Sequence, residues 1–340
     1  MIYFRSDYSQ GAHPKVMEAL VRTNTEHTDG YGIDQHCENA ADMIRKLIGV
    51  EDCSVHMMVG GTPCNVTVIA AALRPYESVV TVHSGHAYHH ETGAVEATGH
   101  RVTTVDDIDG KMTPEAVDLA CEEHEDEHTP LPRMVYISQP TEIGTIYSKA
   151  ELIALRKKCV EKNMFLYVDG ARLGSALTSE HNDLSIQDLA RLCDAFYIGG
   201  TKQGALFGEA VVITNDALKA NFRYCIKQGG GMLAKGRLLG VQFAALFEDG
   251  LYLDASRGAV RQAARIREAF EAKGIGFLVD SPTNQVFPIL TAGQKAAMAE
   301  RFGFETWQKL PDGRTGVRFC TCWATPEANV DALVKAIETL

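Results

Sequence analysis

The sequence predicts an α/β protein with a mostly parallel, seven-stranded sheet flanked by helices, followed by a small C-terminal α+β domain. Short apolar runs alternate with helical patterns through the middle of the chain. The runs are apolar throughout, as strands buried on both faces of a parallel sheet must be. Beyond residue 250 this alternation stops, and amphipathic stretches with short strand-like pieces take its place.

Seven apolar runs are the candidate strands of the sheet, and helical patterns lie between most of them. The helix expected at residue 114 has a clear start signal, because Thr113 can cap it and Pro114 suits its first position. In open α/β sheets ligands bind beyond the carboxyl ends of the strands, so motifs at those ends are candidate site residues. Strands are expected at 55–59, 78–82, 101–105, 133–138, 164–168, 195–198 and 210–214, and helices at 65–73, 114–123, 149–161 and 186–192.

The remaining pattern divides the chain into three parts. We expect an extended N-terminal arm at 1–12, a large domain at 13–249 and a small domain at 250–340. Amphipathic stretches run over 232–247 and 254–272, strand-like pieces over 276–279, 285–289 and 316–320, and a closing helix over 326–339.

Composition limits the partners and the compartment. The formal net charge of −11 disfavours nucleic acid, because little positive charge is available to neutralise phosphates. Nine scattered cysteines, an odd number, predict reduced thiols in the cytoplasm. No apolar run approaches the ~20 residues that span a membrane, and no signal peptide is recognised at the N-terminus. The acidic run at 121–128 is interpreted as a solvated helix end, so no metal site is predicted.

Two motifs at consecutive strand ends predict the chemistry. Residues 167–172 read YVDGAR and residues 199–202 read GGTK. Taken singly, Asp169 fits a surface turn and Lys202 a solvated glycine-rich turn. Together they suit pyridoxal 5'-phosphate (PLP), because a lysine amine forms an imine with its aldehyde and a carboxylate keeps its pyridine nitrogen protonated.

A glycine-rich loop upstream supports this interpretation. Gly60, Gly61 and Thr62 follow a strand and open a helix, where backbone N–H groups and the helix N-terminus favour a phosphate. Alone, the loop is better explained as a plain strand-to-helix turn capped by Thr62, with Pro63 at the first helical position. In combination with Asp169 and Lys202, we interpret it as the phosphate loop.

A histidine-rich segment supplies a candidate for stacking on the pyridine ring. His86 fits that role, but His83, His89 and His90 lie beside it, and periodicity does not select among them. Zinc binding is a rival interpretation, although no paired thiol or carboxylate set accompanies these histidines.

On these residues the chain resembles the PLP-dependent L-threonine aldolases of the aromatic amino acid beta-eliminating lyase superfamily. The resemblance implies fold type I architecture, an amino acid substrate and a homotetramer, a dimer of dimers whose active sites are completed across a dimer interface. The motifs that carry it are residues 4–7, 31–32 and 60–62, His86 with Glu91, residues 169–172, 201–202 and 229–232, and Arg318.

The resemblance also implies a role for each site residue. Lys202, His86 and Asp169 are the catalytic residues: Lys202 binds the cofactor covalently, His86 stacks on its ring and Asp169 pairs with the pyridine nitrogen. Backbone at Gly60, Gly61 and Thr62 holds the phosphate. Substrate binding is assigned to Ser6, Arg172 and Arg318 at the carboxylate, and to Tyr31 from a neighbouring subunit; Arg172 also contacts the cofactor.

Two segments depart from the family pattern. Where many members read Asn-Thr-His-Asn, residues 138–142 read SQPTE, so the histidine that contacts the substrate hydroxyl is missing. The general base is therefore open among His86, a water that it positions, and Glu142. Where members read GGGMRQ, this chain reads GGGMLAKGR, and Lys235 or Arg237 is the candidate to replace the phosphate-side arginine.

The expected reaction is cleavage of L-threonine, L-allo-threonine or a related β-hydroxy-α-amino acid to glycine and an aldehyde. The alternative is a β-eliminating lyase acting on a β-substituted amino acid on the same scaffold. A binding protein without catalysis is disfavoured by the presence of both Lys202 and Asp169. A nucleotide-binding oxidoreductase is disfavoured because no G-x-G-x-x-G follows the first strand. The substrate side chain and the threo or erythro preference stay open.

Overall fold

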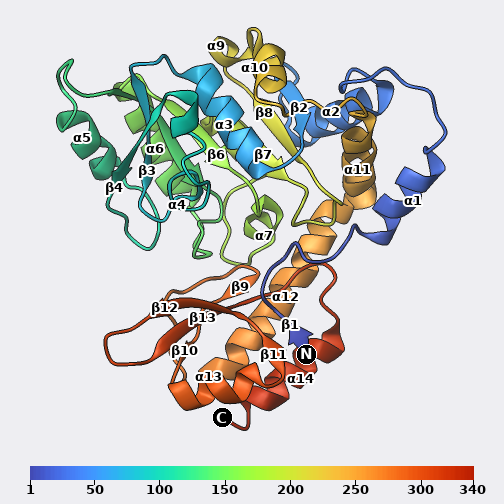
Figure 1. The fold of residues 1–340 in the computed structure, drawn as a ribbon, viewed down its shortest axis with the longest axis vertical. Coiled ribbons are helices and arrows are strands. Elements are labelled where there is room, and N and C mark those ends of the chain that lie inside the picture. The colour runs from blue at the N-terminus through green and yellow to red at the C-terminus, as the bar shows by residue number, and fades with distance from the viewer.

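The central sheet of the computed structural model, which describes all residues from 1 to 340, has the seven expected strands (Figure 1). Its order is β2-β8-β7-β6-β5-β3-β4, in which β4, β3, β5, β6 and β7 run parallel while β8 is antiparallel to both β7 and β2. The prediction of a mostly parallel sheet is confirmed. The strands are β2 (Ser54–Met58), β3 (Glu77–Val82), β4 (Arg101–Val105), β5 (Leu131–Ser138), β6 (Phe165–Asp169), β7 (Ala195–Gly199) and β8 (Glu209–Ile213).

Helices cover both faces of this sheet, which is why its strands are apolar on both sides. Alternate side chains of each strand enter opposite cores, as the two-residue strand period requires. In β6, for example, Leu166 and Val168 join one core and Tyr167 the other. The first core includes residues of α2 (Gln35–Ile48), α5 (Pro114–Glu122), α6 (Lys149–Glu161), α8 (Ile186–Leu192) and α11 (Arg237–Phe247); the second includes residues of α3 (Gly61–Ala72) and α10 (Phe222–Gln228).

Local capping sets several helix starts. The Thr113 side chain accepts from the backbone N–H of Ala116, as expected. Ser148 and Glu151 form a reciprocal capping box at the start of α6. Helix α3 begins at Gly61, earlier than the expected residue 65, and Thr62 lies inside its first turn rather than capping it.

A smaller lobe is built around β13 (Thr315–Cys320), which pairs antiparallel with β9 (Gln285–Val286), β10 (Ile289–Leu290) and β12 (Glu305–Lys309). The long helix α12 (Leu251–Ala272) starts against α7 (Leu173–Leu177) of the large lobe and ends against α14 (Glu327–Ile337) of the small one (Figure 1). One continuous helix therefore crosses both lobes. The domain limits expected at residues 12 and 249 stay predictions.

The N-terminal arm packs on the small lobe. Strand β1 (Ile2–Tyr3) pairs in parallel with β11 (Phe302–Gly303), and Phe4 is buried against the rings of Phe302 and Phe319. The first residues of the chain thus contact its last quarter. The remaining helical segments are α1 (Pro14–Arg22), α4 (His86–His89), α9 (Asp216–Lys219), α13 (Ala292–Ala299) and two 3-10 turns, Glu96–Thr98 and Glu248–Gly250.

Some expected elements differ from the structure. Residues 232–236 are not helical, so the stretch expected from 232 becomes helix only at Arg237. The strand expected at 276–279 is reduced to one bridge between Phe277 and Pro288. The strand expected at 285–289 splits into β9 and β10 on either side of Pro288, which has no N–H to donate. None of the helices is long and apolar enough to cross a membrane.

Asp194 ties three segments of the large lobe together. Its buried carboxylate accepts from Arg156 at 2.6 Å, from the Leu166 backbone N–H at 2.7 Å and from the Asn215 amide at 2.7 Å. We expect Asp194→Ala to lower the free energy of unfolding by about 3 kcal/mol, because it leaves these donors unpaired. Urea denaturation at fixed protein concentration measures the loss.

Asp331→Ala is the matched control for this experiment. Asp331 also pairs with an arginine, Arg265, but Asp331 is exposed and Arg265 is partly exposed. Its loss should change the free energy of unfolding by no more than about 1 kcal/mol. Equal effects in the two variants would contradict a special role for Asp194.

Candidate active site

The Asp169 carboxylate lies at the carboxyl end of β6 and accepts four hydrogen bonds. The Tyr197 hydroxyl and the Ala171 backbone N–H donate to Oδ1. The Tyr136 hydroxyl at 2.7 Å and the Asn65 amide at 3.1 Å donate to Oδ2. Burial opposes the charge of Asp169, but the positive charge of His86 and these donors outweigh it, so the pKa of Asp169 is lowered. The group is an ionised, rigidly held carboxylate.

Asn65, on α3, joins Asp169 to a second buried carboxylate. Its Nδ2 lies 2.7 Å from Glu91 Oε1 and 3.1 Å from Asp169 Oδ2, and its Oδ1 accepts from the Tyr167 hydroxyl at 3.0 Å. These partners assign the amide orientation, since the reverse orientation would turn its oxygen toward two carboxylates. Sequence reasoning did not identify Asn65, because its position inside α3 gives no local signal of a bridge to Glu91 and Asp169.

His86 is held by Glu91. His86 Nδ1 lies 2.7 Å from Glu91 Oε1, and the Glu91 side chain is fully buried, with no partner for Oε2. Burial lowers the pKa of His86, but the hydrogen bond that its ring donates to Glu91 and the charges of Asp169 and Glu142 raise it more, so the net shift is upward. The positively charged imidazolium is therefore favoured.

Lys202 lies in the turn after β7, the strand next to that of Asp169. Glu209 fixes this turn by accepting from the Gly200 backbone N–H at 2.8 Å and the Thr201 hydroxyl at 2.7 Å. Burial and the positive charge of Arg172 lower the pKa of Lys202. A larger fraction of its amine is then neutral, which is the nucleophilic form.

The loop at Gly60 and Gly61 has the features of an anion cradle. Helix α3 has no side-chain cap, so the first backbone N–H groups are free for a ligand. A methyl group added to Gly61 would meet the Tyr197 hydroxyl at 3.0 Å. Because Tyr197 also contacts Asp169, this close approach places the loop beside the carboxylate.

Arg172, one of the predicted substrate-binding residues, is paired within the chain. Its Nε and Nη2 lie 2.6 and 3.1 Å from the two oxygens of Asp7, and Asn284 also donates to Asp7 at 2.9 Å. These partners, with Lys202, hold the pKa of Asp7 well below its usual range despite its burial. Arg172 Nη1 makes no hydrogen bond in the chain. The pairing with Asp7 is another contact that sequence reasoning missed.

Arg318 enters from the small lobe. Its Nη1 donates to Gln285 at 3.2 Å, its Nη2 donates to the backbone oxygen of Arg5 at 3.0 Å, and its guanidinium lies 5.0 Å from the Trp307 ring centroid. Ser6 follows Arg5, and its hydroxyl lies 2.7 Å from that of Ser9. Arg318 is therefore held next to the N-terminal arm.

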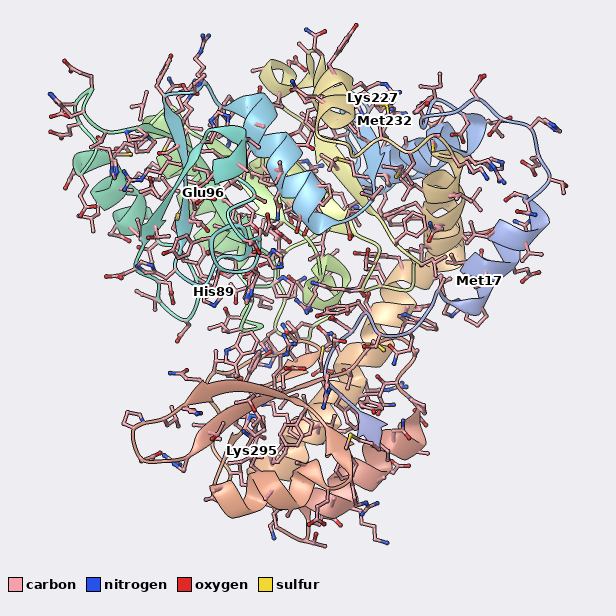
Figure 2. All side chains as sticks on the ribbon, viewed as in Figure 1. Met17, His89, Glu96, Lys227, Met232 and Lys295 are labelled. Atoms are coloured by element: carbon pink, nitrogen blue, oxygen red, sulfur yellow. The ribbon has the colours of Figure 1, made fainter.

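His90 brings the histidine-rich segment close to these cations. Burial and then the positive charges of His86, His89, Arg318 and Lys202 lower the pKa of His90 to about 4. His89 lies at the edge of the large lobe that faces the small one (Figure 2).

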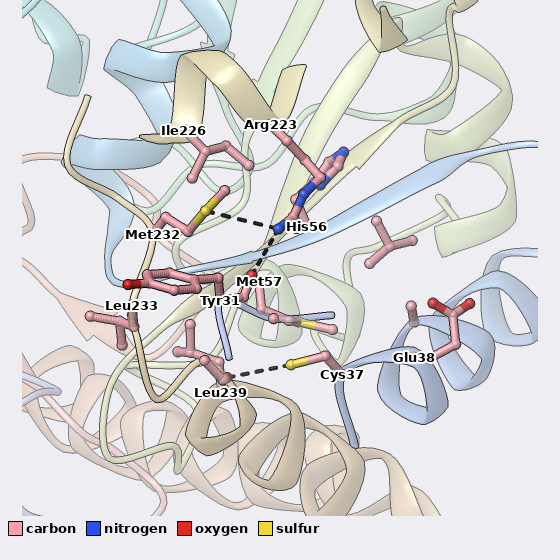
Figure 3. Close-up of a pocket in the computed structure, with 14 residues that line it drawn as sticks. Tyr31, Cys37, Glu38, His56, Met57, Arg223, Ile226, Met232, Leu233 and Leu239 are labelled. Carbon is pink, nitrogen blue, oxygen red and sulfur yellow. Dashed lines mark hydrogen bonds between the residues drawn. The ribbon is translucent and has the colours of Figure 1, made fainter. Parts of the chain in front are cut away.

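Within a single chain, Tyr31 does not lie with the other candidate site residues. It is 45% exposed, its backbone amide bonds to Ala234, and Lys227 Nζ lies 4.4 Å from its ring centroid. It lines a cavity of about 50 Å³ together with Met232 and Leu233 (Figure 3). In Figure 2, Lys227 and Met232 lie at the top of the large lobe, at the opposite side from His89.

The two candidate replacements for the phosphate-side arginine differ. Arg237 is engaged within the chain, since it donates to the Thr23 hydroxyl at 3.1 Å and to the Asn24 backbone oxygen at 3.3 Å. Lys235 is exposed, and its side chain makes no hydrogen bond or ion pair. Lys235 is therefore the candidate whose charge is unpaired within the chain.

These features fit PLP. Asp169 offers an ionised carboxylate, Lys202 an amine whose pKa is lowered, and the N-terminus of α3 free N–H groups for a phosphate. They lie at the carboxyl edge of a doubly covered sheet, where such ligands bind.

Comparisons with known proteins agree with this site. The model of the beta-eliminating lyase family matches residues 3–292. Low specificity L-threonine aldolases of Pseudomonas sp. (strain NCIMB 10558) and Pseudomonas aeruginosa are 31% and 30% identical, with 99% and 98% of this chain and 97% and 96% of theirs covered. The solved structure of Leishmania major threonine aldolase is 44% identical, with a TM-score of 0.98 over 100% of this chain and 99% of that one. Thermus thermophilus aspartate aminotransferase, 17% identical with a TM-score of 0.74 over 100% of this chain and 91% of that one, shares the fold.

Fold and site together define a fold type I, PLP-dependent enzyme. The family model and the sequence identity to the Pseudomonas enzymes over nearly the whole chain show to which family within that class the chain belongs. The chain belongs to the beta-eliminating lyase family and, within it, to the threonine aldolases, which are carbon–carbon lyases.

Glu91→Gln should lower the pKa of His86, because the ring loses a charge-assisted partner while its burial remains. NMR titration of the His86 ring proton in cofactor-free protein measures this pKa. In the parent protein the raised pKa stabilises the fold at pH below about 6.5, and this contribution disappears as the pH rises through the folded-state value. The variant should lose that pH dependence.

Glu96→Gln provides the control, since Glu96 is an exposed carboxylate a few residues along the same segment. It should leave the His86 titration unchanged. An unchanged pKa in Glu91→Gln as well would show that Glu91 does not hold the charge on His86.

Proposed function

We propose that this enzyme cleaves L-threonine, L-allo-threonine or a related β-hydroxy-α-amino acid to glycine and the matching aldehyde. The observation that carries the proposal is the pair of Asp169 and Lys202 at the ends of neighbouring strands, in a chain that belongs to the threonine aldolases. Bound PLP would accept the electron pair that is released when the Cα–Cβ bond of the substrate breaks.

The site residues divide this work. Lys202 would attach the cofactor, and Asp169 would keep the pyridine nitrogen protonated, which its four hydrogen bonds permit because they stabilise the ionised carboxylate. Backbone N–H groups at Gly60, Gly61 and Thr62 would hold the phosphate. His86 would cover one face of the ring, in the orientation that Glu91 fixes.

The substrate carboxylate would lie between the two lobes. Arg318 from the small lobe and the free Nη1 of Arg172 from the large lobe are its proposed donors, with Ser6 from the N-terminal arm. Fixing the carboxylate from two sides orients the Cα–Cβ bond relative to the cofactor ring, which its cleavage requires.

A homotetramer, built as a dimer of dimers, is the proposed assembly, with the protein in the cytoplasm. Tyr31 and Lys235 support it, because both are exposed and lie in the segments that the family places at an active site of another subunit. Lys235 would replace the missing phosphate-side arginine, since Arg237 is engaged with Thr23 and Asn24.

Product analysis with L-threonine, L-allo-threonine and a panel of β-substituted amino acids tests the function. Aldol cleavage gives glycine and an aldehyde in equal amounts. Ammonia and a keto acid would instead identify a β-eliminating lyase on the same scaffold and would overturn the proposal.

Lys202 should be the residue that carries the cofactor. Its lowered pKa and its place in the turn fixed by Glu209 favour reaction with an aldehyde. Borohydride reduction of the cofactor-loaded protein, followed by peptide mapping, should label Lys202 alone, and Lys202→Ala should lose the absorbance of the lysine-bound cofactor. A label on any other lysine would end this assignment.

Arg318→Ala should lower kcat/KM roughly a hundredfold, while cofactor content stays unchanged. Loss of one charged partner of a bound carboxylate removes on the order of 2–4 kcal/mol of transition-state binding. The control is Arg314→Ala, because Arg314 is exposed just before the same strand and pairs only with Asp312. An unchanged kcat/KM in folded, cofactor-loaded Arg318→Ala would show that Arg318 does not bind substrate.

A further inference from the structure

We infer that Glu142 accepts the proton of the substrate β-hydroxyl during cleavage. The inference rests on the proposed aldolase function and names the group that performs one of its steps. It concerns the loop that follows β5, residues 138–142, which contains no histidine.

Backbone geometry places Glu142 at the reacting edge of the sheet. Strand β5 ends at Ser138, whose backbone pairs in register with Asp169 on β6. Glu142 follows in the next loop, and its Oε1 accepts from the Ser138 hydroxyl at 2.9 Å. That hydrogen bond holds the Glu142 carboxylate beside the strand end that carries Asp169.

A glutamine links Glu142 to the proposed substrate-carboxylate site. Gln285 Nε2 lies 3.5 Å from the Glu142 backbone oxygen, while Gln285 Oε1 accepts from Arg318 at 3.2 Å. In addition, Ser281 Oγ lies 3.3 Å from the Gly144 backbone oxygen. The small lobe therefore holds the Glu142 loop and Arg318 together, on the side where the substrate would bind.

His86 is the wrong partner for this proton. Its Nδ1 bonds to Glu91, and Asn65 joins Glu91 to Asp169, so two buried carboxylates surround one imidazole. The raised pKa of His86 favours the imidazolium, which has no lone pair to accept a proton. His86 can donate a hydrogen bond to the substrate oxygen, but the acceptor must be another group.

The electrostatic surroundings of Glu142 suit an acceptor that works near neutral pH. The charged groups that face it are Asp169, His86 and Arg172, with the buried hydroxyls of Tyr136 and Tyr147 nearby. Burial and then the charge of Asp169 raise the pKa of Glu142 to about 7, against the opposing effects of His86 and Ser138. A base with this pKa is partly ionised at neutral pH and binds the transferred proton firmly.

The proposed step balances as follows. The β-hydroxyl proton moves to a Glu142 oxygen, and the electron pair of the O–H bond becomes the second bond of the aldehyde carbonyl. The Cα–Cβ pair stays with Cα, which later takes up a proton to give glycine. Glu142 then releases its proton before the next turnover.

Glu142→Gln tests the step, because it keeps the shape and loses the base. In cofactor-loaded enzyme we expect cleavage to fall at least about a hundredfold. Exchange of the glycine α-hydrogen in deuterium oxide should stay within a few-fold of wild type, because glycine has no β-hydroxyl. Glu142→Asp should recover part of the cleavage rate.

Infrared titration of cofactor-free protein gives a readout that does not depend on activity. Glu142 and Glu209 are the two carboxyl groups whose pKa is raised to about 7. Wild-type protein should show both carboxyls titrating near neutrality, and Glu142→Gln should show one. Ser138→Ala removes a bond that favours the ionised form, so it should raise the pKa of Glu142 and move the acidic limb of the kcat profile to higher pH.

Three results would overturn the inference. Unchanged cleavage in Glu142→Gln would exclude a base role, and an equal fall of cleavage and glycine exchange would assign Glu142 a structural role. If His90→Gln lost cleavage while Glu142→Gln stayed active, His90 would be the group that accepts the β-hydroxyl proton. Wild-type enzyme that exchanges glycine but cleaves no β-hydroxy amino acid would overturn the proposed function itself, which the other outcomes leave intact.

Discussion

The structure depends on two acidic side chains that are buried close together, Asp169 and Glu91. An unpaired buried charge costs several kcal/mol, so each must be matched by donors and by positive charge. Asn65 donates a hydrogen bond to each carboxylate. Two tyrosine hydroxyls and a backbone N–H also donate to Asp169, and His86 is the positively charged partner of Glu91. Helix α3 carries Asn65 and also begins at the glycine-rich loop of Gly60 and Gly61. The anion cradle and the charge network are therefore positioned by one helix.

Lys202 and Asp169 lie at the ends of neighbouring strands, and their surroundings favour the neutral form of one and the charged form of the other. Asp169 receives four donors and its pKa is lowered, so it stays charged. Lys202 is partly buried, and its pKa is lowered by burial and by the charge of Arg172, so its amine is more often neutral. The same burial thus yields a permanent anion on β6 and a nucleophilic amine after β7, because the neighbours differ.

Local patterns predicted much of the fold and named candidate site residues, but they did not predict contacts between residues distant in sequence. Seven apolar runs gave seven strands, since strands buried on both faces leave an unmistakable composition. Strand β12 was not expected, because its residues are largely exposed and polar at a sheet edge. The order of the Asp169 and Lys202 motifs indicated the cofactor. The pairing of Asp7 with Arg172 joins distant parts of the chain and follows no local pattern.

The junction of the N-terminal arm with β13 has a consequence for biosynthesis. The backbone oxygen of Phe4 accepts a hydrogen bond from the Cys320 backbone N–H, and that of Arg5 accepts one from the Arg318 guanidinium, so residues 4 and 5 are held by residues 318 and 320. During translation the large lobe can form its sheet early, but residues 4 and 5 stay without these partners until residues 318–320 have been made. Until then the side chain of Phe4 also lacks the rings of Phe302 and Phe319 against which it is buried in the folded chain.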